Sequence, residues 1–160
     1  MARHLAQLNI AWMRGSIDDP VMADFVGAID SVHKLAGRSP GFVRIVPDNG
    51  YQPWGDPKAL PNLTVWEDIN SLRDFTYRSA HGNLFSKRDK WFVSPGRAHM
   101  ALWWFDDAGD GPDYDDAIRR LDHLQENGPS PEAFTFGQPY DVDGVPLGMP
   151  SENRMKTDVD

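Results

Sequence analysis

The apolar stretch "MALWWF", residues 100–105, is the feature that most constrains the fold of this chain. In a β-strand, successive side chains point to opposite faces of the sheet. Here both sets are apolar: Met100, Leu102 and Trp104 on one side, and Ala101, Trp103 and Phe105 on the other. Neither face of this strand can be left in water, so the sheet that contains it must be covered on both faces.

Apolar periodicity predicts the order of the other elements. Alternating patterns predict strands, and apolar residues at helical spacing predict helices. The predicted strands are 4–12, 42–47, 62–68 and 98–105, with a short one at 133–137. The predicted helices are 18–37, 70–92 and 113–128, of which the second is either continuous or broken near Gly82. The order β-α-β-β-α-β indicates an α+β ferredoxin-like fold, an antiparallel sheet with helices on one face.

The chain of 160 residues is long enough for one domain with a substantial core. We expect that domain at residues 1–137, followed by an extended or disordered tail at 138–160. Residues 48–61 hold three prolines and two glycines, which predicts a long loop of the kind that often borders a site. Because helices on one face leave the other bare, we expect a homodimer packed sheet to sheet around a cavity, a dimeric α+β barrel.

Composition excludes several classes of function. The net charge of −8 opposes binding to nucleic acid or to an anionic membrane. The absence of cysteine rules out disulfides and thiolate metal sites, and no apolar run approaches the roughly 20 residues of a membrane-spanning helix. With no secretory signal pattern either, we expect a cytoplasmic protein. No nucleotide-binding loop, nucleophile elbow or histidine pair at ligand spacing occurs, so we expect neither a metal nor a cofactor.

Several segments resemble a bacterial family of unknown function in the dimeric α+β barrel superfamily. They are "LAQLNIAWMRG", "VWEDINSLRDFTYRSAH", "KRDKWF" and "ALWWFDDAGDGPDYDDAIRRLDHLQENGPSPEAFTF", and the resemblance spans residues 5–137. That superfamily includes cofactor-independent antibiotic-biosynthesis monooxygenases and small polyketide cyclases. The resemblance implies the fold more strongly than any reaction, because one scaffold carries several chemistries. Where the family pattern has Gly-His after "LWW", this chain has Gly109 and Asp110, so any role of that histidine is absent or altered.

Three polar residues of the helix predicted at 70–92 are the catalytic candidates. If the helix is continuous, Tyr77, His81 and Arg88 share an arc with its large apolar residues. Burying such groups is costly unless they meet a partner or a ligand. We therefore expect His81 as a general base, Tyr77 as an acid or oxyanion donor, and Arg88 as the group that holds a carboxylate or enolate. The alternative is structural: Arg88 reaches solvent or pairs with Asp74, and His81 bonds a backbone carbonyl.

Other polar and aromatic residues are candidates for substrate binding. Gln7 and Asn9 alternate with the apolar residues of the first strand and can supply hydrogen bonds inside a cavity. Trp66 and Trp103 can stack on a flat ligand, although packing in the core is the more frequent fate of a strand tryptophan. His99 lies on the most apolar strand with Ala101 and Trp103 and is a further candidate, although a histidine at the start of a strand is more often at the surface or already hydrogen-bonded.

These residues predict a cofactor-independent enzyme of the polyketide-cyclase type, acting on a small hydrophobic or aromatic, polyketide-like substrate. Such an enzyme removes a proton next to a carbonyl and stabilises the resulting enolate. One alternative is a cofactor-independent antibiotic-biosynthesis-type monooxygenase, in which the substrate carbanion reduces oxygen directly. Another is a protein that binds a hydrophobic molecule without catalysis.

Overall fold

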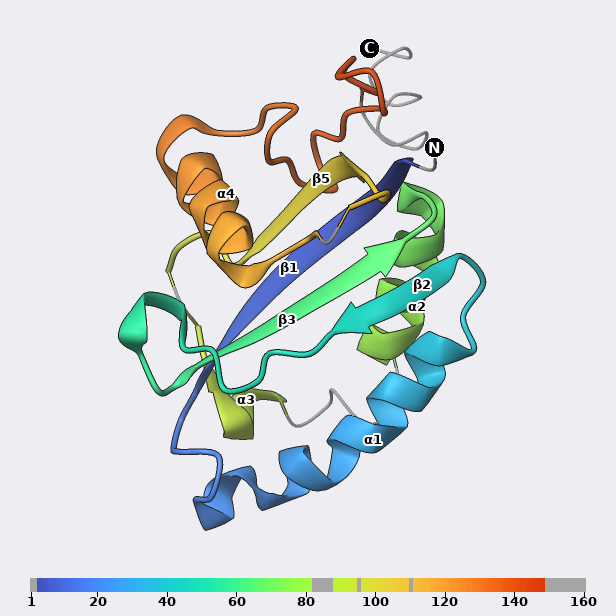
Figure 1. Ribbon diagram of the computed structural model, residues 1–160. Coiled ribbons are helices and arrows are strands. Elements are labelled where there is room, and N and C mark those ends of the chain that lie inside the picture. Colours follow the sequence, from blue (N-terminus) through green and yellow to red (C-terminus); the bar gives the residue numbers. More distant parts are fainter. Residues whose placement is uncertain (1–2, 82–87, 95, 110, 149–160) are drawn as a thin grey trace, which may run out of the picture.

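The computed structural model describes residues 3–81, 88–94, 96–109 and 111–148 (Figure 1). The strands are β1 (Arg3–Met13), β2 (Phe42–Val46), β3 (Ala59–Trp66), β4 (Phe92–Val93) and β5 (Met100–Asp106). The α-helices are α1 (Ala23–Gly37), α2 (Ile69–His81), α3 (Arg88–Trp91) and α4 (Tyr114–Asn127), and short 3-10 helices occupy Pro20–Met22 and Pro53–Gly55.

The strands form one five-stranded sheet with β1 near its centre. On one side β1 pairs antiparallel with β3, which pairs antiparallel with β2. On the other side β1 pairs with β5 over residues 3–9 and with β4 at Trp12 and Met13. The order β2-β3-β1-β5, with α1 and α2 as the connections, is that of a ferredoxin-like α+β fold, so the predicted fold class is confirmed.

The two faces of β1 belong to different cores. Leu5 packs with Leu72 of α2, and Met13 packs near Phe25 of α1, so the connecting helices lie on one face as predicted. Leu8, which points the other way, packs with Leu121 of α4. In Figure 1, α4 accordingly lies in front of the sheet and α2 behind it.

Helix α4 changes the argument for a second subunit. Both faces of β5 are buried within the single chain: Leu102 is 0% and Trp103 1% exposed. Leu102 packs with Phe134, and Trp103 packs with α4 residues. At this part of the sheet, residues of the same chain therefore cover the face that we expected a second subunit to cover. The homodimer stays a prediction.

The segment predicted as a helix at 70–92 contains two described helices and the first residue of a strand. Helix α2 ends at His81, α3 is a separate helix, and Phe92 already belongs to β4. Met13 of β1 pairs with Phe92, and Trp91 is buried with Met22 beneath α1, so tertiary packing decides the conformation here. Residues 82–87, which the prediction included, lie outside the described residues.

Two further boundaries differ from the sequence prediction. Strand β3 begins at Ala59, which pairs with Trp12. Residues 59–61, which were predicted to end the loop 48–61, therefore belong to the sheet. The strand predicted at 133–137 is reduced to two isolated bridges, which join Phe134 to Leu102 and Ala133 to Ser130. Beyond it, residues 138–148 form no helix or strand, and the Trp104 indole N–H donates to the carbonyl of Tyr140 over 2.8 Å.

Candidate functional site

The predicted catalytic residues do not form one cluster within the described chain. Tyr77 on α2 is 66% exposed, and Arg88 on α3 is exposed. His81 is the last residue of α2, and its side chain lies outside the described residues. The shared apolar arc assumed one helix, so the expected burial of Tyr77 is wrong for the single chain. The catalytic roles of all three residues stay predictions.

Gln7 and Trp66 belong to a buried polar network on the α1/α2 face of the sheet. The Trp66 indole N–H donates to the Thr64 hydroxyl over 2.9 Å, and that hydroxyl donates to Gln7 Oε1 over 2.8 Å. Gln7 Nε2 lies 3.4 Å from the Met100 sulfur. Trp66 has no exposed surface and packs against Phe42 and other aromatic rings. These contacts correspond to the core-packing alternative for Trp66, and a role in substrate binding stays a prediction.

The other two predicted binding residues lie elsewhere. Trp103 faces α4, on the opposite side of the sheet from the Gln7 network, with the Arg120 guanidinium 5.2 Å from its ring centroid. His99 is exposed, and its backbone carbonyl accepts a hydrogen bond from the Ile10 amide over 2.8 Å. The structure therefore does not bring Trp103 together with Gln7.

Asn9 and Asn62 form the most open part of the α1/α2 face. They are cross-strand partners in the β1–β3 ladder, and Met100 of β5 pairs with Asn9 on its other side. Asn62 is exposed although β3 lies between β1 and β2, and Asn9 is half-buried. Neither side-chain amide hydrogen-bonds to any residue that the structure describes. Solvent therefore reaches the middle of the sheet beside two unpaired amides.

Helix α1 supplies apolar surface on the same face. Its only fully buried residue is Ala36. An amphipathic helix normally buries its apolar stripe against the core. In α1 the stripe is only half-buried, and its residues are Phe25, Ala28, Ile29, Val32 and Leu35. Helix α1 thus adds half-covered apolar surface to the face of the sheet that carries Asn9 and Asn62.

Sequence reasoning missed Asn62. Its signal is an asparagine within a strand of otherwise apolar and β-branched residues, where Asn is normally depleted. The sequence pattern predicts Asn62 as the first residue of a strand, a position where asparagine is not unusual. Because β3 begins at Ala59, Asn62 lies inside the strand and opposite Asn9.

A second polar cluster holds the segment that follows β5. Arg44 of β2 donates two hydrogen bonds to the Asp107 carboxylate, over 2.7 and 2.8 Å, and one to the carbonyl of Gly111 over 2.8 Å. His4 Nδ1 lies 2.7 Å from the same carboxylate. The Arg44 hydrogen bonds, aided by His4, lower the pKa of Asp107 to about 2. His4 is thus held by a contact with a buried end of the Asp107 carboxylate.

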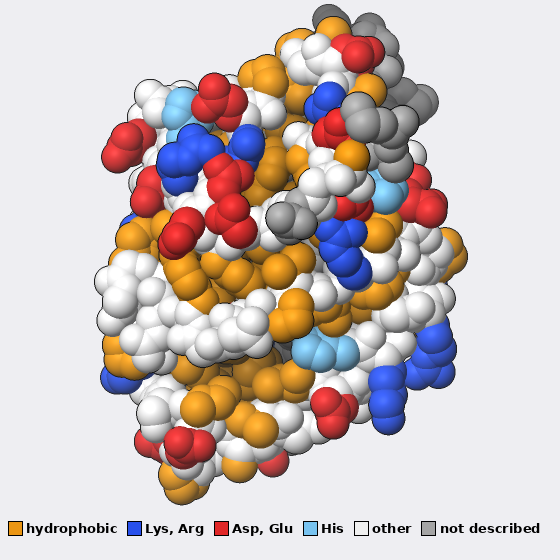
Figure 2. Space-filling model, in the orientation of Figure 1, with side chains coloured by type: hydrophobic (Ala, Val, Ile, Leu, Met, Phe, Trp, Pro, Cys, Tyr) orange, Lys and Arg blue, Asp and Glu red, His pale blue; other side chains and the backbone are white. Residues whose placement is uncertain are grey.

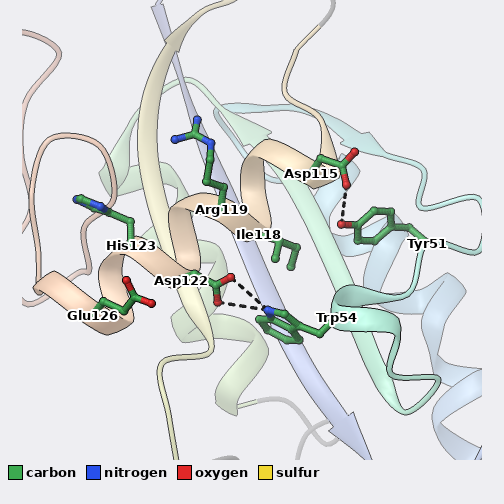
Figure 3. Close-up of a pocket in the computed structure, with 8 residues that line it drawn as sticks. All are labelled: Tyr51, Trp54, Asp115, Ile118, Arg119, Asp122, His123 and Glu126. Atoms are coloured by element: carbon green, nitrogen blue, oxygen red, sulfur yellow. Dashed lines mark hydrogen bonds between the residues drawn. The ribbon is translucent and has the colours of Figure 1, made fainter.

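A hollow of about 530 Å³ lies on the α4 side of the sheet, between α4 and residues 47–58 (Figure 3). Its lining residues come from those two segments: Tyr51, Trp54, Asp115, Ile118, Arg119, Asp122, His123 and Glu126. Trp54 takes a positive φ of 52° and is 40% exposed. Burial and the hydrogen bond from its hydroxyl to Asp115 raise the pKa of Tyr51. The sequence singled out the loop, but not these residues.

The described residues contain neither a metal-binding cluster nor a membrane-spanning helix. No group of three histidine, aspartate or glutamate side chains among them is arranged to hold a metal ion. No helix in the described part of the chain is long and apolar enough to cross a membrane.

Comparison with known proteins identifies a family. Residues 4–147 match the family described as Domain of unknown function (DUF3291), and the chain belongs to that family. No curated protein sequence matches the chain.

Two solved structures illustrate the likeness in fold. SnoaB, a cofactor-independent oxygenase from Streptomyces nogalater, is 18% identical with a TM-score of 0.48, covering 70% of this chain and 100% of that one. A monooxygenase from the gene ActVA-Orf6 of Streptomyces coelicolor, in complex with nanaomycin D, is 17% identical with a TM-score of 0.43, covering 71% of this chain and 94% of that one. At these values neither likeness carries an activity over to this chain.

Proposed function

We propose that this protein is a cofactor-independent enzyme acting on a small, mostly apolar or aromatic molecule bound on the α1/α2 face of the sheet. The observation that carries the proposal is the Asn9–Asn62 pair: two unpaired amides on adjacent inner strands, one of them exposed. An inner strand normally buries such a position, whereas here Asn62 is exposed and Asn9 half-buried, so a ligand on this face can reach both amides. A ligand with oxygen atoms at one edge would satisfy both amides.

The surroundings favour an uncharged ligand. The row of side chains across the sheet is Met100, Asn9 and Asn62, which carries no formal charge. A carboxamide donates and accepts hydrogen bonds, so it recognises carbonyl and hydroxyl groups rather than ions. Donors fixed on strands also stabilise the negative charge that develops when a carbonyl compound is converted to its enolate. Polyketide-like molecules carry such carbonyls.

A cyclase-type reaction needs a base in addition to these donors. His81 remains the candidate, since it ends α2, the helix that lies on the same face of the sheet as Asn9. A histidine near its ordinary pKa can remove a proton next to a carbonyl, and an asparagine N–H can then donate to the enolate oxygen. A monooxygenase would use the same base and let the carbanion reduce oxygen. A binding protein would use the amides alone.

The test compares three variants with an activated phenol and a poly-β-ketone as probes. Asn62→Ala should weaken probe binding about fivefold to tenfold, the effect of one hydrogen bond, and Asn9→Ala should act in the same direction. Asn70→Ala, which removes an exposed asparagine at the start of α2, is the matched control and should change nothing. Equal affinities for all three variants would contradict the site.

The type of reaction is then identified from two measurements, the product profile and the uptake of oxygen. An altered product profile of the poly-β-ketone without oxygen uptake supports the cyclase, and oxygen uptake with the phenol supports the monooxygenase. In either case His81→Ala should abolish turnover while probe affinity is kept. Binding without any turnover would reject the enzyme and leave the binding protein.

A further inference from the structure

The hollow between α4 and residues 47–58 lies on the opposite side of the sheet from Asn9 and Asn62, so it is independent of the proposed function. In Figure 3, Tyr51 and Trp54 approach α4 from the loop, and Ile118 lies between them. Figure 2 shows charged side chains gathered over α4, above a band of hydrophobic side chains across the middle of the same face.

Three carboxylates of α4 line the hollow: Asp115, Asp122 and Glu126. Their spacing of seven and four residues places them on one side of the helix. Arg119 also lines the hollow, but its guanidinium is paired with Asp116, which does not. Glu126 is exposed and has no hydrogen-bond or ion-pair partner within the described ranges. The local charge is therefore negative, because among the described residues neither Asp115 nor Glu126 has a cationic partner, whereas Asp122 is paired with Arg97.

The aromatic walls are held in place. The Tyr51 ring stacks on Tyr114 with 5.4 Å between centroids, and its hydroxyl donates to Asp115 over 2.9 Å. The Trp54 indole N–H donates to the Asp122 carboxylate over 3.2 Å. Ile118, 7% exposed, gives an apolar floor. Fixed aromatic walls and a negative rim favour an organic cation over an anion.

The chain itself contains one cation bound in this way. The Arg97 guanidinium carbon lies 4.4 Å from the centroid of the Trp54 ring. The same guanidinium lies 3.1 Å from Asp122 Oδ1. An indole and a carboxylate, both of which line the hollow, thus already hold a guanidinium. This contact within the chain shows that the Trp54 ring and the Asp122 carboxylate are positioned to pack against a planar cation.

We propose that this hollow binds an organic cation, a primary amine or guanidinium carried on a short aromatic or apolar body. The body lies against Tyr51 and Ile118, and the charged end lies between Asp122 and Glu126. A metal ion fits the hollow less well, because the acids of the described chain do not form a group that could hold one. A ligand with an aromatic ring and an ammonium group uses both the walls and the rim.

The test titrates the full-length, 15N-labelled protein with 2-phenylethylamine and with its neutral counterpart 2-phenylethanol, following amide shifts by NMR. The amine should shift amides of α4 and residues 51–54, and the alcohol should bind at least tenfold more weakly. Raising the salt concentration should weaken the binding of the amine but not that of the alcohol, since salt screens the attraction between the ammonium group and the carboxylates. Equal binding of amine and alcohol, or shifts elsewhere, would overturn the proposal.

Charge-matched variants separate a specific site from general attraction to an acidic protein. Glu126→Gln should lower the affinity for the amine about fivefold, which is the effect expected from the loss of one surface ion pair. Asp30→Asn removes one exposed charge from α1 and should change nothing. If both variants weaken the amine equally, the attraction is diffuse and the proposal is wrong. Asn62→Ala should leave amine binding intact, so failure of the proposed function and failure of this site are distinguishable.

Discussion

Replacing Asp107 by asparagine tests whether the Arg44–Asp107–His4 cluster stabilises the fold. The cluster lowers the pKa of Asp107 from 3.8 to about 2. At about 1.4 kcal/mol for each tenfold change in an equilibrium, this corresponds to about 2 kcal/mol. Asp107 is 9% exposed but Arg44 is 38% exposed, so solvent screening reduces the expected contribution to about 1–2 kcal/mol.

The sign of the pH dependence follows from the lowered pKa. The stabilisation is fully present above the unfolded-state pKa of 3.8 and is lost as the pH falls through about 2, where the folded carboxylate takes up its proton. Urea unfolding, followed by circular dichroism, should therefore show Asp107→Asn less stable than wild type at pH 7 by about 1–2 kcal/mol. The difference should narrow as the pH approaches 2.

Asp30→Asn is the control for removal of a carboxylate, because Asp30 is exposed on α1. Its free energy of unfolding should match wild type at every pH. The reasoning about the cluster is refuted if Asp107→Asn is as stable as wild type at pH 7, or if the difference between them does not change on acidification.

Three other outcomes are expected. Thr64→Val should lower the free energy of unfolding by about 2–4 kcal/mol, because the Gln7 and Trp66 groups lose their buried partner; a loss under about 0.5 kcal/mol in urea titration would contradict the network. Leu121→Ala in α4 should cost about 2–5 kcal/mol in the same assay if α4 covers the sheet. Tyr77→Phe should leave the melting temperature unchanged, since the side chain is 66% exposed, and should lower turnover only if Tyr77 is catalytic.

Local patterns were sufficient to predict the sheet and its order. Alternation along residues 4–12 and the apolar run at 100–105 are strong, short-range signals, and they located β1 and β5. The β-α-β-β-α-β order then left few topologies to consider. Helix boundaries were less certain, because the pattern at 70–92 reads as one helix while the packing of Trp91 and Phe92 separates α3 and β4 from α2.

The site depended on contacts that no local pattern contains. Arg44 and Asp107 are 63 positions apart and meet only because the segment that follows β5 reaches β2, which lies on the other side of β1 in the sheet. The position of α4 over the sheet likewise depends on how the chain turns after β5, not on the amphipathicity of the helix. Asn9 was identified from the alternation of its strand, whereas Asn62 required the true start of β3.

The most direct test of the account is where an uncharged aromatic carbonyl compound binds. Amide shifts in 15N-labelled protein, titrated with such a probe, report the position without requiring turnover. The account predicts shifts at Asn9, Asn62 and Met100, together with the half-buried residues of α1, and none along α4. Shifts confined to α4 and residues 51–54, or no saturable shifts on β1 and β3, would contradict it.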